Sequence, residues 1–529
     1  METVRARLIV KSPSLSFHSM SKGFFISCAI DYPNANLHMG HLYEKTIADV
    51  IARVHRLNGE KVLFTVGSDE HGEKVEKAAH DAGYSPQQYV DNMAMLFRRL
   101  FDQSLISYDR FIRTTEKSHV TAAQVFFQSL FDAGDIYPDL YEGWYCVSDE
   151  TFWTEKDLVE KNGAKLCPNP HCGKPVERVK EESYFFKWSN FQKPLEEWYD
   201  HVPANVFPEF RKKEMEQFMK DGLHDISFSR KSLQWGIQVP FNSEHTIYVW
   251  GDALVNYLTV CGYPEKYADF WPADIHVVGH DINRFHSLLW PAMLMSAKIP
   301  LPKQVLVHGF VNDERGEKMS KSKGNVVDPL LILEKFGIEP IRYYLLREAP
   351  LGNDLAFSEK NLIERNNSEL ADGLGNLVYR VLSMLEKYCN GVIPDIQPDG
   401  QILGQASLSA QESYRSYLSH DIQGALVHAW KIVSLGNKSI ADSEPWKKMK
   451  DGKRDEVEVL LVTEVELLRQ LSILIQPVLP TTSDSICAQF GFSTPTFSQL
   501  STTPPSSPRA VKKGSVLFVK RELPAVETK

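Results

Sequence analysis

Residues 24–72 alternate between strand-like and helix-like patterns, and this restricts the fold more than any other part of the chain. The apolar run FFISCAI (24–30) is followed by apolar residues at helical spacing in LYEKTIADVIARVHRLNG (42–59). The last residue of this segment, Gly59, marks the expected end of a helix. A second strand-like run, KVLFTVGSDEHG (61–72), ends in polar residues. A strand, a helix and a strand with short connections predict a βαβ unit, and therefore a parallel sheet.

Two histidine-containing segments lie at the ends of these predicted strands. NLHMGH (36–41) follows the first strand, and GSDEHG (67–72) ends the second. Parallel sheets bind ligands at the carboxyl ends of their strands, so we expect both segments at a ligand site. In the first turn of the helix, His38 and His41 would share one face beside Gly40, which has no side chain.

The composition argues against a disulfide-stabilised or membrane-spanning protein and leaves a nucleic-acid partner open. The formal charge of −9 does not indicate a nucleic-acid partner, although local basic patches matter more than the sum. Seven cysteines in 529 residues favour a reducing compartment without a disulfide framework. No run of about 18 apolar residues is present, so we expect no membrane span.

The first 22 residues are basic, rich in serine and poor in acids. They contain Arg5, Arg7, Lys11 and Lys22 against the single acid Glu2. This composition is typical of a mitochondrial transit peptide, and a short disordered tail is the alternative.

The segment HMGH is weak evidence by itself, because two histidines near a helix start are more often incidental than catalytic. A metal pair would need a third ligand and usually an i, i+4 spacing with an acid. The later segment KMSKS (318–322), followed by Gly324, makes a flexible cationic loop suited to a polyphosphate. A lysine run alone is usually a solvated surface, but the two segments together in one predicted nucleotide-binding sheet are a specific pair.

With this pair of motifs the chain resembles the class I aminoacyl-tRNA synthetases, and among them the methionyl-tRNA synthetases of mitochondrial type. The resemblance covers roughly residues 24–480 and also rests on GSDEHG, YVWGDAL, GHDINRFHSLLWPAML, SELADGLGNLVYR and EPW. It implies a methionine-tRNA ligase. The carboxylate of methionine would attack the α-phosphate of ATP to give methionyl-adenylate and pyrophosphate, and the 3′-terminal adenosine of tRNA(Met) would then accept the methionyl group.

The resemblance and the patterns along the chain together imply an α/β fold. Residues 141–230 interrupt the α/β pattern, and every apolar stretch from about 360 to 490 has helical spacing. The expected domains are a transit peptide or disordered tail (1–22), a parallel-sheet Rossmann-type nucleotide-binding catalytic domain in two halves (23–140 and 231–315), an inserted connective domain (141–230), the KMSKS loop with a connecting segment (316–360), an α-helical bundle anticodon-binding domain (361–490) and a loosely ordered tail (491–529).

The resemblance also implies roles for individual residues. The expected catalytic residues are His38, Gly40, His41, Lys318 and Lys321. The expected ATP contacts are His38, His41, Gly279, Asp281, Lys318, Ser320, Lys321 and Ser322, with Mg²⁺ sharing the phosphate charge. The expected methionine contacts are Ile30, Tyr32, Asp69, Trp250, Ala253, Tyr257, Ile282, Phe285 and His286. Without the resemblance, Trp250, Ile282 and Phe285 would be assigned to ordinary core.

Three positions depart from the family pattern. Gly251 stands where a larger apolar residue is usual, His280 replaces a usual lysine, and Asp31 replaces a proline or an aromatic residue. The changes at His280 and Asp31 bear on the ATP contacts, and none of the three removes a principal group.

A zinc site in the insert is left open by the sequence. Family members that bind zinc use two Cys-x-x-Cys pairs, whereas this chain offers Cys146, Asp149, Cys167, His171 and Cys172 at wider spacing. Structural zinc prefers thiolates, and some mitochondrial-type members have lost the site. We therefore expect an insert without zinc, with a structural zinc as the alternative.

The helical domain is expected to bind the anticodon. Asn376, Arg380 and Trp446 match the anticodon-binding positions of the family, and the basic residues within 447–454 could contact phosphate. The expected partners are tRNA(Met), L-methionine and ATP, for a monomer in the mitochondrial matrix, with the cytoplasm as the alternative.

Three rival interpretations remain open at this point. Another adenylyltransferase with a histidine-glycine-histidine turn would lack the insert and the helical domain. A non-catalytic tRNA-binding relative would not need the intact set of histidines and lysines. Enzymes for leucine or isoleucine would carry a larger insert.

Overall fold

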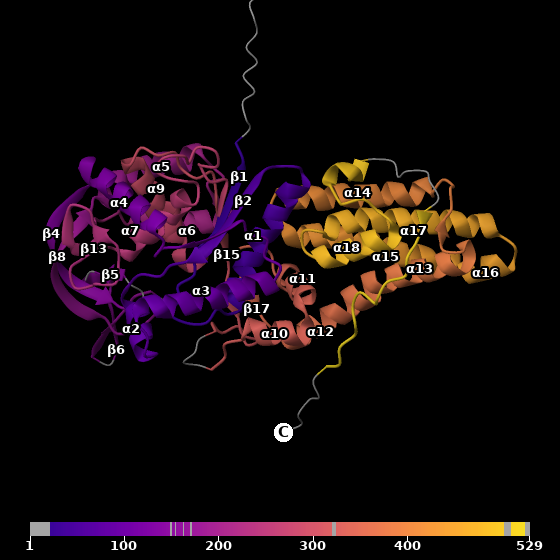
Figure 1. Cartoon of the computed structure of the whole chain (residues 1–529), viewed down its shortest axis with the longest axis horizontal. Coiled ribbons are helices and arrows are strands. Elements are labelled where there is room, and N and C mark those ends of the chain that lie inside the picture. The colour runs from indigo at the N-terminus through magenta and orange to yellow at the C-terminus, as the bar shows by residue number, and fades with distance from the viewer. Residues whose placement is uncertain are drawn as a thin grey trace, which may run out of the picture.

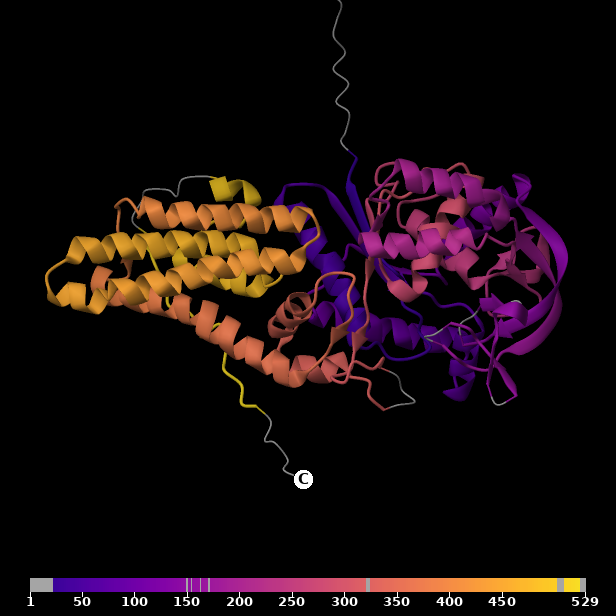
Figure 2. The same ribbon diagram turned by 180° about the vertical axis from the view of Figure 1, so that it is seen from behind.

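The computed structural model describes residues 22–523 apart from 149–150, 154, 162, 170–171, 320–323 and 502–508. The chain forms two halves (Figure 1). The parallel sheet and the insert make one half, and a bundle of long helices makes the other. The view from behind shows the same division, with the helices of residues 329–365 running along the junction (Figure 2). Almost all of residues 1–22, including the predicted transit peptide, lie outside the described residues.

A six-stranded parallel sheet forms the centre of the catalytic half. Its strand order is β3-β2-β1-β14-β15-β9, and every neighbouring pair is parallel. The chain moves outward from β1 in one direction and returns to β14 on the other side, so the order reverses between these two strands. Ligands bind at such a reversal, at the carboxyl ends of the strands. The strands are β1 (Phe24–Cys28), β2 (Val62–Ser68), β3 (Arg110–Arg113), β14 (Ile275–Gly279), β15 (Val305–His308) and β9 (Val206–Phe207).

Helices cover both faces of this sheet. Alternate residues of β1 point to opposite faces, so Ile26 packs with helices α1 and α3 and Phe25 packs with α4, α8 and α9. This two-sided burial explains the nearly continuous apolar runs in the sequence. These helices are α1 (Met39–Leu57), α2 (Glu73–Asp81), α3 (Pro86–Gln103), α4 (Lys117–Asp132), α7 (Val249–Ala253), α8 (Asn256–Thr259) and α9 (Trp290–Ser296), with the short turns η3 (His280–Ile282) and η4 (Phe285–Leu289).

The insert is built on an antiparallel sheet of order β10-β8-β4-β5. Its strands are β4 (Ile136–Cys146), β5 (Thr151–Trp153), β8 (Glu177–Phe186) and β10 (Ile226–Ser227), and a small hairpin joins β6 (Val159–Lys161) to β7 (Ala164–Leu166). A three-stranded sheet follows, from β11 (Ser229–Arg230), β12 (Gln238–Val239) and β13 (Asn242–Ile247).

The boundaries of the insert differ from the predicted 141–230. Strand β4 begins at Ile136, and β13 continues the antiparallel region to Ile247. Strand β9, which lies within the predicted insert, instead pairs with β15 at the edge of the parallel sheet. The helices on either side of it, α5 (Gln192–His201) and α6 (Glu209–Lys220), therefore belong with the catalytic half.

The second half is helical, as expected. Aspartates cap two of its long helices, because Asp399 accepts from the backbone at the start of α14 and Asp421 at the start of α15. Among the described helices, none is both long and apolar enough to cross a membrane. The helices are α10 (Pro329–Phe336), α11 (Ile338–Glu348), α12 (Glu359–Arg365), the π-helical η6 (Asn366–Gly375), α13 (Asn376–Cys389), α14 (Gly400–Leu418), α15 (Ile422–Ser443), α16 (Pro445–Lys450), α17 (Arg454–Ile475) and α18 (Pro480–Phe490).

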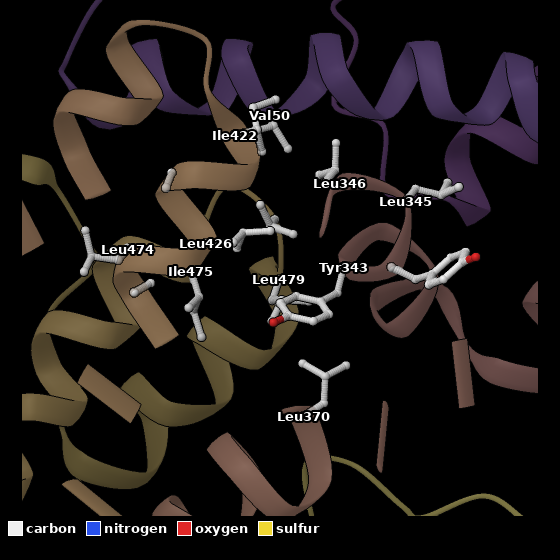
Figure 3. Packing of buried hydrophobic residues seen from close by; sticks show 14 of the residues in the cluster. Val50, Tyr343, Leu345, Leu346, Leu370, Ile422, Leu426, Leu474, Ile475 and Leu479 are labelled. Atoms are coloured by element: carbon white, nitrogen blue, oxygen red, sulfur yellow. The ribbon is translucent and has the colours of Figure 1, made fainter. Parts of the chain in front are cut away.

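One apolar core runs from the catalytic sheet into the bundle. It includes Val50 of α1, Leu346 of α11 and Ile422 of α15 (Figure 3). Burial of such side chains is worth about 1.5–3 kcal/mol each, so the two halves are joined by a substantial hydrophobic contact.

The segment after residue 491 is more ordered than expected. Strand β19 (Arg509–Ala510) pairs with β18 (Val392–Ile393), and Phe518 is buried. The Asn366 side chain donates to the carbonyl of Val519 at 3.0 Å. The expectation of a loosely ordered tail is therefore wrong for residues 509–523, which pack against the bundle.

Candidate active site

A cavity of about 480 Å³ opens at the carboxyl ends of β1, β2, β14 and β15. It lies where the strand order reverses, and residues of both histidine-containing segments line it. Its walls also include the start of α1, the loop after β15 and part of the insert.

The predicted substrate residues meet in this one cavity. All nine predicted methionine contacts line it, and so do His38, Gly40, His41, Gly279, Asp281 and Lys318. Ser320, Lys321 and Ser322 lie outside the described residues. Lys318 is exposed and lies over the ring of Phe310 at 4.4 Å.

His38 and His41, the two signature histidines of the HMGH segment, cap the start of α1. The backbone N–H of Gly40 donates to Nδ1 of His38 at 3.1 Å, and the N–H of His38 donates to Nδ1 of His41 at 3.0 Å. Burial, and then the positive charges of Lys318 and Lys45, lowers the pKa of His38 to about 4, and burial lowers the pKa of His41 strongly. Both rings are therefore neutral at pH 7. Because each Nδ1 accepts a hydrogen bond, each ring carries its proton on Nε2 and keeps that donor for a ligand.

Gly40 has a local role in this arrangement. A Cβ atom at this position would lie 2.9 Å from Cε1 of His38, which is too close. Glycine at this position therefore lets the His38 ring fold back over the helix start.

A buried carboxylate follows β2. Asp69 is 7% exposed, and its N–H donates to the carbonyl of Asp31 at 2.9 Å, which fixes the ends of β1 and β2 to each other. A buried carboxylate on the wall of a cavity favours a cationic ligand group. The α-ammonium of an amino acid is such a group.

Aromatic rings form the apolar part of the cavity. Trp250 stacks on Phe285, with ring centroids 3.9 Å apart and an interplanar angle of 8°. His286 donates from Nδ1 to the carbonyl of Ile282 at 3.0 Å, so its Nε2 accepts from the hydroxyl of Tyr257 at 2.8 Å. Burial lowers the pKa of His286 to about 4, so this ring is neutral at pH 7. Neutral rings of this kind pack well against a thioether.

Several residues that line the cavity were not assigned a role from the sequence. The argument from strand ends could have found His308, which is the last residue of β15, and Gly309. Glu44 lies in the same helix as His41, and the apolar spacing of that helix gives no signal for a site residue there. The unassigned lining residues are Ala29, Asp31, Asn34, Glu44, Lys74, Ser148, Asn169, Lys174, Val249, Leu254, Asn256, His308, Gly309, Phe310, Val311 and Met319.

The insert brings three cysteines together. The sulfur atoms of Cys146, Cys167 and Cys172 lie within 4.8 Å of one another, and those of Cys146 and Cys172 are 3.5 Å apart. The other two candidate ligands, Asp149 and His171, lie outside the described residues. Cys172 also lines the cavity, so the cluster adjoins the active site.

The predicted anticodon residues lie in the helical half, on α13 and α16. Asn376 is exposed, Arg380 is half-buried and Trp446 is 44% exposed. Helix α16 lies at the end of the bundle that points away from the catalytic half (Figure 1).

Comparison with known proteins adds independent evidence. The family model for class I tRNA synthetases (M) matches residues 24–382. Methionine–tRNA ligase of Caldanaerobacter subterraneus subsp. tengcongensis is 44% identical over 527 residues, which cover 96% of this chain and 81% of that protein. The Clostridium tetani methionine–tRNA ligase is 42% identical, over 95% of this chain and 79% of that protein.

Solved structures agree with these relatives. Methionyl-tRNA synthetase of Mycobacterium tuberculosis in complex with methionyl-adenylate superposes with a TM-score of 0.90 at 38% identity, over 94% of this chain and 99% of that one. The free form of the same enzyme gives a TM-score of 0.83 at 35% identity, over 95% and 99% of the two chains.

Proposed function

This chain belongs to the class I methionyl-tRNA synthetases and is a methionine–tRNA ligase, and from that premise we propose how its residues divide the reaction. The observation that supports the division is that the predicted methionine and ATP contacts within the described residues line a single cavity.

Methionine is held at the end of the cavity formed by β1, β2 and the aromatic rings. Asp69 accepts from the α-ammonium group, and the rings of Trp250, Phe285 and Tyr257 surround the thioether. The hydrogen bond between Tyr257 and His286 fixes both polar groups, so their orientation is set before the substrate arrives.

ATP is held between the start of α1 and Lys318. The Nε2–H groups of His38 and His41 donate to the phosphates while negative charge develops at the α-phosphorus. The N-terminal end of α1 favours the same charge. Lys318 and Lys321 hold the β- and γ-phosphates. Preorganised donors of this kind stabilise the transition state without a covalent enzyme intermediate, and Mg²⁺ that arrives with ATP adds positive charge to the phosphates.

Exchange of labelled pyrophosphate into ATP tests this assignment when it is run with each of the twenty amino acids. Methionine alone should support fast exchange. Equal exchange with another amino acid, or none with methionine, would overturn the assignment of the pocket.

We propose a structural zinc for the insert, in place of the zinc-free insert expected from the sequence. Three thiols within 4.8 Å match the thiolate-rich coordination that structural zinc prefers, and a fourth ligand would come from Asp149 or His171. The role proposed for the metal is to hold the loop that carries Cys172 against the cavity.

The helical half is proposed to bind the anticodon of tRNA(Met) through Asn376, Arg380 and Trp446, in a monomer. The mitochondrial matrix is proposed as the compartment, because the first 22 residues are basic and poor in acids. Fusion of residues 1–22 to a fluorescent protein tests the compartment, and a fusion that stays in the cytoplasm would contradict it. Light scattering during size-exclusion chromatography of the full chain gives its molar mass and tests whether it is a monomer.

A further inference from the structure

Lys45 is a fully buried lysine directly behind the cavity wall. It follows His41 by one helical turn of α1, and its side chain is 0% exposed. Its ammonium group donates to Asp31 Oδ1 at 2.5 Å, to Glu44 Oε1 at 2.8 Å and to the carbonyl of Ala29 at 3.2 Å. An ammonium group has three N–H donors, so these three acceptors use all of them and hold the charge in place.

The two carboxylates that hold Lys45 line the cavity, whereas Lys45 itself does not. Asp31 Oδ2 is buried and has no hydrogen-bond partner among the described residues. Glu44 Oε2 contacts Nε2 of His308, which also lines the cavity, at 3.0 Å. Two acidic groups therefore lie beside the signature histidines, in a cavity that has to accept the most negatively charged substrate of the reaction.

Two arginines of the same core do not compensate Asp31 and Glu44, because Arg53 and Arg342 both pair with Asp49. His308 carries a positive charge only when it is protonated, and it contacts Glu44 rather than Asp31. Burial raises the pKa of the Cys28 thiol, so that group stays neutral.

We propose that Lys45 is a positioning residue for ATP, which neutralises the Asp31 and Glu44 carboxylates and orients Glu44 toward His308. This inference rests on the proposal that the cavity binds ATP. If Lys45 served folding alone, its loss would weaken the binding of ATP and of methionine equally. If it compensates charge, its loss should affect the two substrates in opposite directions, because excess negative charge repels a triphosphate and attracts an α-ammonium group.

The test compares KM values for ATP and methionine in the pyrophosphate exchange reaction at pH 8.5. A high pH is needed to keep the Asp31 carboxylate ionised, because burial raises its pKa to about 7 and removal of Lys45 raises it further. Protonation of Asp31 cancels the uncompensated charge, so the effect on the KM for ATP should be smaller at pH 7 than at pH 8.5. Lys45→Met keeps the length of the side chain and removes its charge. We expect the KM for ATP to rise about tenfold, which corresponds to repulsion from one uncompensated and partly screened charge. The KM for methionine should stay equal or fall.

Two further variants keep the test decisive. Lys45→Met/Asp31→Asn restores the net charge of the pair and should bring the KM for ATP back toward that of the unaltered protein. Asp31→Asn alone keeps Lys45 and should lower the KM for ATP or leave it unchanged, which can be measured even if Lys45→Met does not fold. Lys212→Met is the matched control, because Lys212 is also buried but donates to the carbonyls of Tyr199 and Pro203 away from the cavity.

The inference is overturned if Lys45→Met raises both KM values alike, if the double variant is no better than the single one, or if Asp31→Asn raises the KM for ATP. These outcomes are distinct from a failure of the proposed function, because that failure would abolish methionine-dependent exchange in the unaltered protein.

Discussion

The carboxylate of Asp49 lies 2.6 Å from the guanidinium group of Arg342, and neither side chain is exposed. Asp49 belongs to α1, the helix that begins with the signature histidines, and Arg342 belongs to α11. The same guanidinium group donates to the carbonyls of Val478 at 2.9 Å and Pro477 at 3.0 Å, beyond the end of α17. One buried charge pair therefore joins the catalytic helix to the bundle.

Arg342→Met should strongly destabilise the protein. It leaves the Asp49 carboxylate buried with only part of its partners, and loss of one partner of a buried pair typically costs about 3–5 kcal/mol. The expected result is a lower midpoint of thermal unfolding, which circular dichroism and calorimetry both measure.

Arg415→Met is the control for this change. Arg415 pairs with Glu412 on an exposed face of α14 and is 66% exposed, so its loss should move the midpoint little. Equal midpoints for Arg342→Met and Arg415→Met would show that the buried pair does not hold the two halves together.

His41→Ala and Lys321→Ala should each slow adenylate formation. Each change removes a preorganised donor to the developing phosphate charge, which typically costs about 10²–10³ in rate. Pyrophosphate exchange measures the rate, and calorimetric titration of methionine without ATP is the control, because neither side chain is assigned to methionine. Exchange close to that of the unaltered protein in both variants would remove these residues from the mechanism.

His420 should make stability depend on pH between about 4 and 6.5. Burial lowers its pKa to about 4 from the ordinary 6.5, so in this range the unfolded chain binds a proton that the folded chain does not. The free energy of unfolding therefore decreases as the pH falls from 6.5, by up to about 1.4 kcal/mol per pH unit from this residue, and is unaffected by it above 6.5.

His420→Asn should reduce this slope. The backbone of His420 has a φ of 63°, which asparagine tolerates better than most residues. Denaturant unfolding of both proteins from pH 4.5 to 7.5 gives the comparison, and parallel curves would show that His420 titrates normally in the folded protein.

The sequence predicted those parts of the fold that have a repeating pattern or a position at a strand end. The βαβ unit of residues 24–72 and the helices after residue 360 follow from apolar periodicity. The position of His38 and Asp69 in one cavity follows from the shared edge of β1 and β2. The roles of these residues remain predictions.

Other features depend on contacts between distant segments and left no local signal. Strand β9 has only two residues, too few for a period, and its place in the sheet is set by its pairing with β15. Lys45 is a lysine on a helix and would be placed in solvent, yet Asp31 and Ala29 at the end of β1 bury it. Phe518 lies in a turn-rich segment, and only its packing against the bundle orders it.

Cys167→Ser should lower both the zinc content and the stability of the protein. If zinc holds the cluster, the purified protein contains about one zinc per chain, and loss of one thiolate ligand weakens the site. Mass spectrometry of the metal content and thermal unfolding with and without a chelator give the two measurements. Cys487→Ser is the control, because Cys487 lies in α18 of the bundle. Metal-free protein with full activity and unchanged melting would exclude the zinc site.

Trp446→Ala should reduce aminoacylation of tRNA while pyrophosphate exchange continues. Stacking of a base on an aromatic ring is worth about 1–3 kcal/mol, which corresponds to about 5- to 150-fold in tRNA affinity. The exchange reaction needs no tRNA, so the adenylation site should be unaffected.

The alternative is that Trp446 serves the core of the bundle, in which case its loss would cost about 3–5 kcal/mol of stability. Its exposed fraction of 44% argues against this, whereas Trp430 of α15 is 9% exposed and donates to the carbonyl of Glu369. Trp430→Ala is therefore the matched control and should lower the melting temperature, and Trp446→Ala should not. Weaker charging with unchanged melting supports an anticodon contact at Trp446. Unchanged charging by a folded Trp446→Ala variant would place the tRNA contact elsewhere on the bundle.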